Sequence, residues 1–238
     1  MRLYQYYIML QKRNIFLLKG GLGNQLFILL KAYTLGEVEI WTGNLRRYSV
    51  PRSLEVDPCK LITCNVRNGN IALLFILRIF DLLRISEVRC MSSTYFLDYY
   101  QNVGVYNKRA IIGFIDKTRS LLNIEEKGSK LIHVRMTDFN DSDATIIDFL
   151  NGCKELNGSV FMTDDEDRLA RILSYMNIPV KIIGTEKVGA LELLELMGGY
   201  SAIESNGSTL AFWAAFLCGR EFKSTVKHLQ KNHDLIYG

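Results

Sequence analysis

The stretch FLLKGGLGNQLF, residues 16–27, decides how the chain begins to fold. The apolar run Ile15–Leu18 has the length and composition of a buried strand, and 25–35 is long and apolar enough for a buried helix. Between the two runs lie three glycines, which permit a tight turn. The sequence therefore predicts a strand, a glycine turn and a helix that starts at Gln25, with Asn24 as its N-cap residue.

The glycine turn has two interpretations. Glycines after a strand let the backbone approach a bound molecule, and the amides at the start of the next helix can hold an anion or a sugar hydroxyl group. The dinucleotide-binding pattern G-x-G-x-x-G needs a third glycine where this chain has Leu26, so that pattern is absent. On spacing alone, a turn with a purely structural role is as well supported as a binding site.

The composition predicts a globular protein without an extended basic region. The chain has 238 residues, 48% of them hydrophobic, which is enough for one large domain or two small ones. The net charge of +4 comes from 29 basic and 25 acidic residues spread along the chain. We therefore expect no nucleic-acid partner, whereas an anionic small molecule or a membrane surface stays open as a partner.

Cysteine usage and the first residues predict a cytoplasmic location. The five cysteines are an odd number and widely spaced, without a C-x-x-C pair or a histidine cluster, so we expect neither a zinc site nor a disulfide framework. The N-terminal segment MRLYQYYIMLQKRN has only a short apolar stretch and no cleavage site of small residues. These features argue against a signal peptide.

The longest apolar run, Ile71–Leu77, is the candidate for contact with a membrane. It is interrupted by Arg78, Asp81 and Arg84 and is far shorter than the roughly 20 residues that cross a bilayer. A buried amphipathic helix over 71–85 is the favoured interpretation, and peripheral contact with a membrane surface is the alternative.

Apolar runs of strand length alternate along the chain with longer segments of helical period. This alternation predicts an α/β fold with parallel sheets and crossover helices, and the polar stretch at 123–129 predicts a linker between two halves. Ligands of open parallel sheets bind beyond the carboxyl ends of the strands, so the polar turns at those ends are candidate sites. The predicted strands are 14–19, 38–42, 87–91, 131–134, 159–163, 180–183 and 200–203, and the predicted helices are 25–35, 71–85, 107–122, 165–176, 187–197 and 208–217.

One such turn follows the strand in LIHVRMTDF, residues 131–139. His133 and Arg135 lie on one face of the strand, and Asp138 follows it. The planar donor fork of an arginine suits a diphosphate, and an aspartate can orient the arginine or accept a sugar hydroxyl group. The alternative is a buried His–Asp pair beside a surface arginine.

A second turn lies in SVFMTDDEDRLARIL, residues 159–173. Thr163 and Glu166 have the spacing of a capping box, and Asp164 and Asp165 suit the positive end of the helix dipole. The same carboxylates can accept two hydrogen bonds from guanine, and the sequence does not separate these uses.

A third turn lies in AIESNGSTLAFWAAFL, residues 202–217, where a strand ends at Asn206 and an apolar helix follows. The first amides of this helix and two hydroxyl groups, including that of Ser208, form a favourable site for a phosphate. The alternative is ordinary N-capping of a buried helix, in which Phe212 and Trp213 belong to the core.

Together these segments resemble, in order and approximate spacing, the motifs of the α-1,2-fucosyltransferase family, whose members transfer L-fucose from GDP-L-fucose. The resemblance runs from about residue 15 to residue 218. The motifs are KGGLGNQLF, YFLDYYQ at 95–101, HVRMTD, FMTDD and SNGSTLAFWAAFL.

The resemblance implies two facing Rossmann-like α/β domains, an architecture called GT-B. An acceptor-side domain would span 1–125, and a domain that binds the GDP-sugar would span 126–238. The reaction would invert the anomeric carbon without a metal or other cofactor. It would join fucose from GDP-β-L-fucose to a glycan acceptor in an α-1,2 linkage, during synthesis of a surface polysaccharide.

The resemblance also assigns roles to residues. Arg135 would neutralise the β-phosphate as GDP leaves, and the helix start at Ser208 and Thr209 would share that charge. The general base that takes the proton of the acceptor is not placed, and Asp138 and His133 are its candidates. The predicted donor-binding residues are Gly21, Gly23, Asn24, Gln25, Arg135, Thr163, Asp164, Asp165, Asn206, Ser208 and Thr209.

The chain departs from the family pattern in places. The family has HxRRGD where this chain has Met136 and Thr137 after the single Arg135, and SNSTFSWW where this chain has Gly207 after Asn206. These departures leave two alternatives to fucose transfer. One is the same mechanism with another GDP-deoxyhexose donor, and the other is a relative that binds GDP or a glycan without catalysis.

Overall fold

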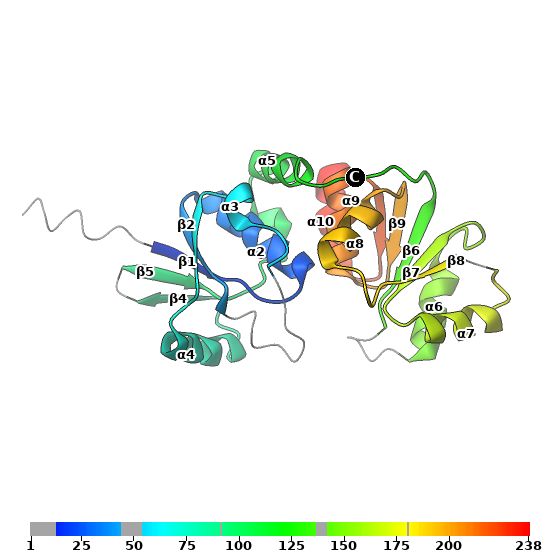
Figure 1. Ribbon diagram of the computed structural model, residues 1–238, viewed down its shortest axis with the longest axis horizontal. Helices are drawn as coiled ribbons and strands as arrows, with labels where there is room; N and C mark the ends of the chain where they lie inside the picture. The colour runs from blue at the N-terminus through cyan, green and yellow to red at the C-terminus, as the bar shows by residue number, and fades with distance from the viewer. Residues whose placement is uncertain (1–12, 44–53, 91, 137–141, 180) are drawn as a thin grey trace, which may run out of the picture. The chain divides into compact units, whose positions relative to one another are not determined.

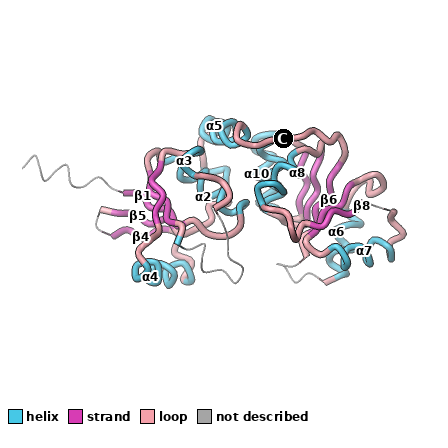
Figure 2. The backbone as a smooth tube through the Cα atoms, viewed as in Figure 1, coloured by secondary structure: helices cyan, strands magenta, loops and turns pink. Residues whose placement is uncertain are grey.

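The computed structural model describes residues 13–43, 54–90, 92–136, 142–179 and 181–238. The chain divides into two compact units, unit 1 (Met1–Phe114) and unit 2 (Ile115–Gly238), and each is an α/β unit built on its own sheet (Figures 1 and 2). The boundary between the units falls inside helix α5 (Lys108–Arg119). The boundary predicted from the sequence, between residues 125 and 126, lies further along the chain.

Unit 1 has a five-stranded sheet in the order β3-β2-β1-β5-β4. All neighbouring strands are parallel except β4, which pairs antiparallel with β5. The strands are β1 (Arg13–Leu17), β2 (Val38–Trp41), β3 (Cys64–Arg67), β4 (Glu87–Cys90) and β5 (Ser93–Phe96). The helices are α2 (Leu22–Leu35), α3 (Pro58–Leu61), α4 (Ile71–Leu82), the short 3-10 helix η3 (Val103–Val105) and α5 (Lys108–Arg119). Helix α5 continues into unit 2.

The alternating side chains of β1 hold one helix on each face of this sheet. Ile15 and Leu17 pack with Leu74 of α4 on one face. Phe16 points to the other face and stacks on Phe96, with 4.3 Å between the ring centroids. Figure 1 shows α2 and α4 on opposite sides of the sheet. Alternation of side chains along a strand therefore accounts for the three-layer arrangement.

Unit 2 has a second five-stranded sheet, in the order β10-β9-β6-β7-β8, with all strands parallel. Helices α6 and α7 lie on one face, where they pack on Ile132, Val134 and Phe161, and α8, α9 and α10 lie on the other (Figure 1). The strands are β6 (Lys130–Val134), β7 (Val160–Thr163), β8 (Lys181–Gly184), β9 (Ala202–Ser205) and β10 (Glu221–Ser224), and the helices are α6 (Asp143–Gly152), α7 (Glu166–Tyr175), α8 (Ala190–Gly198), α9 (Thr209–Cys218) and α10 (Lys227–Tyr237).

The prediction of an α/β fold with parallel sheets is confirmed, and so is the placement of Phe212 and Trp213 in the core, where both are fully buried. Three strands, β3, β5 and β10, and three helices, α3, α6 and α10, were not predicted from the sequence. The missed edge strand CNVR is only four residues long and largely exposed, so it lacks the apolar run that marks a buried strand.

In both sheets the strand order reverses next to the first strand of the unit. In unit 1, β1 lies between β2 and β5, and in unit 2, β6 lies between β7 and β9. Ligands of open α/β sheets bind at such topological switch points, beyond the carboxyl ends of the strands. The glycine turn follows β1, and the segments that contain Arg135 and Asn206 follow β6 and β9. The topology thus places the predicted motifs at the two switch points.

The five cysteines are free thiols. The sulfur atoms of Cys59 and Cys64 lie 3.5 Å apart, a proximity that their spacing in the sequence did not suggest. Among the residues that the structure describes, no helix has both the length and the apolar character needed to cross a membrane.

We expect Leu173→Ala to destabilise unit 2 by about 2–5 kcal/mol, because Leu173 is fully buried on α7 and its truncation leaves a cavity. The matched change Tyr175→Ala, on the exposed side of the same helix, should change the free energy of unfolding by less than about 0.5 kcal/mol. Denaturant unfolding followed by the fluorescence of Trp213, in a Trp41→Phe background, measures unit 2 alone. Similar effects of the two changes would contradict the packing described for α7.

Candidate functional site

The switch point of unit 2 is held together by the side-chain amide of Asn206. The backbone N–H of Arg135 donates to Oδ1 of Asn206 at 2.9 Å, and Nδ2 of Asn206 donates to the carbonyl oxygen of Arg135 at 2.8 Å. The last paired residues of the ladder between β6 and β9 are His133 and Ser205, so the amide continues the pairing beyond the strands. Only an amide side chain supplies both a donor and an acceptor in this arrangement. Asn206 therefore fixes the backbone position of Arg135.

The start of α9 lies directly beside this bridge. The hydroxyl oxygen of Ser205 accepts hydrogen bonds from the N–H groups of Gly207 (3.3 Å) and Ser208 (3.2 Å). Ser208 is the N-cap residue, and its hydroxyl oxygen accepts from the N–H of Ala211 at 3.3 Å. Gly207 has φ +131°, and a Cβ atom there would lie 2.8 Å from Val226. Glycine at position 207 is therefore favoured by its backbone conformation and by the closeness of Val226. The positive end of the α9 dipole faces the switch point.

His133 is buried behind this helix start. Its Nδ1 atom lies 3.5 Å from the hydroxyl oxygen of Ser205, and the residue is 4% exposed. Burial, together with the nearby charge of Arg135, lowers its pKa to about 4, while Asp164 acts in the opposite direction. A buried ring with this lowered pKa is neutral at neutral pH and is a weak base. Its position beside the Ser205 hydroxyl group suits a structural role at the start of α9.

Asp164 connects β7 to the segment after β6. Its Oδ1 atom accepts a hydrogen bond from the N–H of Met136 at 2.7 Å. The Met136 side chain is 2% exposed and belongs to the core between the sheet and α6 and α7. The residue that stands where the family has a second arginine is therefore a core residue of this chain.

The predicted capping box of Thr163 and Glu166 is wrong. The N-cap residue of α7 is Asp165, whose Oδ1 atom accepts from the N–H of Arg168 at 3.0 Å. Thr163 is the last residue of β7, and its hydroxyl oxygen accepts from the N–H of Asp165 at 3.1 Å. The Thr163 hydroxyl group accepts from the N–H of Asp165, two residues on, and the helix starts after Asp165, whose carboxylate caps it.

An acidic cavity of about 330 Å³ lies at the carboxyl ends of β7 and β8. Gly184 forms part of its wall, and a Cβ atom there would lie 2.6 Å from a carboxylate oxygen of Glu166. Glu186 was not predicted from the sequence. The polar residues Thr185, Glu186 and Lys187, directly after β8, are the signal that would have located it. The lining residues are Asp165, Glu166, Asp167, Gly184, Glu186 and Lys187.

The glycine turn of unit 1 differs from the prediction. The helix begins at Leu22 and its N-cap residue is Gly21, so Asn24 is not the cap. Gly20 has φ +76°, and a Cβ atom there would lie 3.0 Å from the Asn24 side chain. Because glycine permits this conformation, the chain turns before residue 21 and the helix starts earlier than predicted.

Two side-chain hydrogen bonds hold this turn. Nε2 of Gln25 donates to the carbonyl oxygen of Gly20 at 2.9 Å. Oδ1 of Asn24 accepts from Nε2 of Gln101, at the end of the motif YFLDYYQ, at 2.9 Å. Two of the predicted motifs, far apart in the sequence, are therefore joined at the switch point of unit 1.

Lys19 is a residue of this turn that the sequence analysis did not select. Its Nζ atom lies 2.6 Å from Oδ1 of Asp81 on α4 and 4.3 Å from the centre of the Tyr99 ring, and the residue is 5% exposed. A lysine placed directly after an apolar strand and before the glycines is the signal that could have drawn attention to it. The ion pair ties the glycine turn to α4.

The remaining predicted site residues are located as follows. Gly23 is buried in the first turn of α2, and a Cβ atom at Gly21 would meet no atom within 4 Å. Thr209 is the first residue of α9. Asp138 lies outside the described residues. In the part of the chain that the structure describes, no group of three or more His, Cys, Asp or Glu residues has the geometry of a metal site.

Comparison with known proteins adds no assignment. No family model matches the sequence, and no curated protein matches it. A dipicolinate synthase chain from Bacillus halodurans is a solved structure with 10% sequence identity over 94% of this chain and 88% of that chain, at a TM-score of 0.20. A likeness this weak carries no argument about fold or function.

We expect the buried ring of His133 to make unit 2 less stable at acid pH. The unfolded chain binds a proton at an ordinary histidine pKa of about 6.5, whereas the folded chain binds it only near the lowered pKa of about 4. Folding stability is therefore lost as the pH falls from about 6.5 to 4, by on the order of 3 kcal/mol. Replacement by the neutral residue in His133→Asn should remove this part of the pH dependence in denaturant unfolding. An NMR titration in which the His133 ring protonates near pH 6.5 would contradict this assignment.

Proposed function

We propose that the chain is an inverting glycosyltransferase that transfers L-fucose from GDP-L-fucose to a hydroxyl group of a glycan acceptor, forming an α-1,2 linkage. Its two Rossmann-like units would form the two domains of a GT-B enzyme. One observation carries the proposal: the amide of Asn206 fixes Arg135 beside the start of α9, and both belong to the ordered set of motifs that resembles the family.

The chemistry requires positive charge at this position. In a displacement with oxocarbenium character, negative charge builds up on the departing diphosphate. The guanidinium group of Arg135, on a backbone that Asn206 fixes, and the positive end of the α9 dipole would take up this charge without a metal ion. Removal of one preorganised donor of this kind typically costs about 2.7–4 kcal/mol of transition-state stabilisation.

The acidic cavity at β7 and β8 suits the guanine base of the same donor. β7 and β9 are alternate strands, about 10 Å apart, so the cavity and the α9 start lie along the same edge of the sheet. A carboxylate can accept hydrogen bonds from both N1–H and N2–H of guanine. Asp165 and Glu186 line the cavity and are the candidates for this contact.

Roles remain for the other predicted residues. Because His133 is buried, Asp138 is the candidate for the general base. Gly21, Gly23, Asn24 and Gln25 would contribute to donor binding from unit 1. An enzyme of this kind would work in the cytoplasm, on a glycan that becomes part of a surface polysaccharide.

The burial of Met136 favours a second candidate function. A core methionine cannot supply the second positive charge that the family has at this position. The same site could therefore take another GDP-deoxyhexose, or bind GDP or a glycan without turnover. Comparison of GDP-sugar donors in one assay separates the first possibility from fucose transfer.

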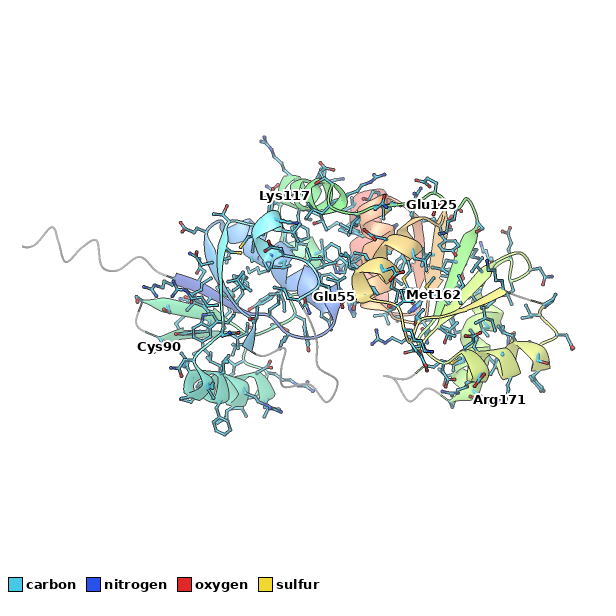
Figure 3. All side chains as sticks on the ribbon, in the orientation of Figure 1. Glu55, Cys90, Lys117, Glu125, Met162 and Arg171 are labelled. Carbon is cyan, nitrogen blue, oxygen red and sulfur yellow. The ribbon has the colours of Figure 1, made fainter. Side chains whose placement is uncertain are left out.

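We expect Arg135→Lys to weaken binding of GDP at least tenfold and to lower acceptor-dependent release of GDP from GDP-fucose roughly a hundredfold. A lysine keeps the charge but loses the planar donor fork that matches a phosphate. Calorimetric titration with GDP and a coupled assay of GDP release measure the two effects. The control Arg171→Lys, at an exposed arginine of α7 labelled in Figure 3, should change neither.

The outcomes of this experiment distinguish the candidates. If the purified protein never consumes GDP-fucose with a broad panel of acceptors, the proposed transfer is wrong. If it nevertheless binds GDP in a way that depends on Arg135, it is a binding relative without turnover.

We also expect Asp165→Asn to reduce the preference for GDP over ADP about tenfold. Asparagine caps a helix as well as aspartate does, so α7 keeps its N-cap, but the carboxylate that would bind guanine is lost. Competition between the two nucleotides measures the preference. Asp116→Asn, at an exposed carboxylate of α5, is the control. An unchanged preference would place the base elsewhere.

A further inference from the structure

Helix α4 of unit 1 carries an apolar face that no part of the described chain covers. The helix contacts the sheet through Leu74 and Leu77, which are buried. Figure 3 shows side chains that project from α4 on the side away from the sheet. The exposed large apolar residues of α4 and the turn after it are Ile71 (80%), Phe75 (62%), Ile76 (49%), Ile79 (48%), Leu82 (74%), Leu83 (66%) and Ile85 (38%).

These side chains form one continuous surface. At 3.6 residues per turn, the exposed positions from 71 to 83 span an arc of roughly 140° on the helix. Exposed apolar residues are normally scattered singly, and a contiguous patch marks an interaction surface. The prediction that the segment is a buried amphipathic helix therefore holds for only one of its faces.

The exposed charges around the patch are mainly positive, because three arginines stand against one exposed acidic residue, Glu87 at the start of β4. Arg78 lies at one edge of the exposed arc, and Arg84 and Arg89 are exposed nearby. Asp81, the acidic residue within α4, is already paired with Lys19 at 2.6 Å. An apolar arc bordered by arginines complements a surface that is apolar inside and anionic at its boundary.

We propose that α4 docks unit 1 on an anionic lipid bilayer. The helix, about 18 Å long, would lie in the plane of the interface, with Phe75, Ile79 and Leu82 among the acyl chains and the arginines at the phosphate groups. A convex helix surface suits a deformable bilayer, and the arginines match its negative charge. This inference goes beyond the proposed transfer reaction and does not depend on it.

The docked helix would be connected to the glycine turn. The ion pair between Lys19 and Asp81 joins α4 to the segment that follows β1, next to Gly20. The bilayer surface would therefore lie across α4 from the switch point of unit 1. An acceptor carried on a lipid would meet this unit at that end of its sheet.

The experiment is sedimentation of the full chain with vesicles in the absence of any nucleotide. The vesicles contain either phosphatidylcholine alone or phosphatidylcholine mixed with phosphatidylglycerol. The wild-type chain should bind the anionic vesicles more strongly, and less so as the salt concentration rises. The double change Phe75→Asn and Leu82→Asn should weaken binding at least tenfold, because both apolar contacts with the bilayer are lost.

Two further variants separate the contributions. Arg78→Gln with Arg84→Gln should weaken binding to anionic vesicles roughly tenfold while leaving the weak binding to phosphatidylcholine unchanged. The matched control changes Val105 and Tyr175, two exposed apolar residues away from α4, to asparagine and should bind like the wild type. The melting temperature of each variant shows whether it is folded.

Several outcomes would overturn the proposal. They are failure of the wild type to bind anionic vesicles, equal binding to both kinds of vesicle, and equal binding by the α4 variant and the control. If light scattering shows a wild-type dimer that becomes a monomer on changing Phe75 and Leu82, a second copy of the chain covers α4 instead. None of these results bears on GDP binding, so failure here is distinguishable from failure of the proposed function.

Discussion

The carboxyl edge of the second sheet depends on two hydrogen bonds made by one side chain. The ladder between β6 and β9 ends at the pair of His133 and Ser205, and a buried backbone group without a partner is costly. Asn206 supplies a partner for both the N–H and the carbonyl group of Arg135. The backbone of Arg135 therefore has its position set by a single amide, beside the start of α9.

The first unit solves a similar problem with glycine and two amides. Gly20 turns the chain through a conformation that favours glycine, the Gln25 side chain satisfies its carbonyl oxygen, and Asn24 reaches Gln101. In both units, hydrogen bonds of side-chain amides hold the backbone just beyond the end of a strand. The side-chain amides of Asn24, Gln25 and Asn206 therefore all have partners within their own unit, which orders the two turns.

Much of this arrangement could be predicted from the sequence, because alternating apolar runs identify buried strands and apolar helices directly. The helix after Ser208 and its burial followed from an unbroken apolar run with a capping residue before it. The two predicted N-caps were wrong: a glycine turn before Asn24 lets α2 start at Leu22, and Asp165 rather than Thr163 caps α7. The edge strands and α10 could not be found because their burial comes from one face or from neighbours distant in the sequence. Glu186 and Lys19 stand in polar positions directly after strands, and the topology shows that these positions lie at the carboxyl edges of the sheets.

The apolar pattern of α4 predicted a buried helix, but only one of its faces is buried, and this difference has a physical reason. A helix that is apolar on most of its circumference is normally buried on all sides. In a three-layer unit, however, a helix of the outer layer has only one face against the sheet, and here Leu74 and Leu77 fill that contact. The apolar residues on the opposite face add nothing to this packing and lower solubility. Their presence beside exposed arginines is therefore better explained by contact with another surface than by folding, and the ion pair of Lys19 and Asp81 would connect that surface to the glycine turn with which the chain begins.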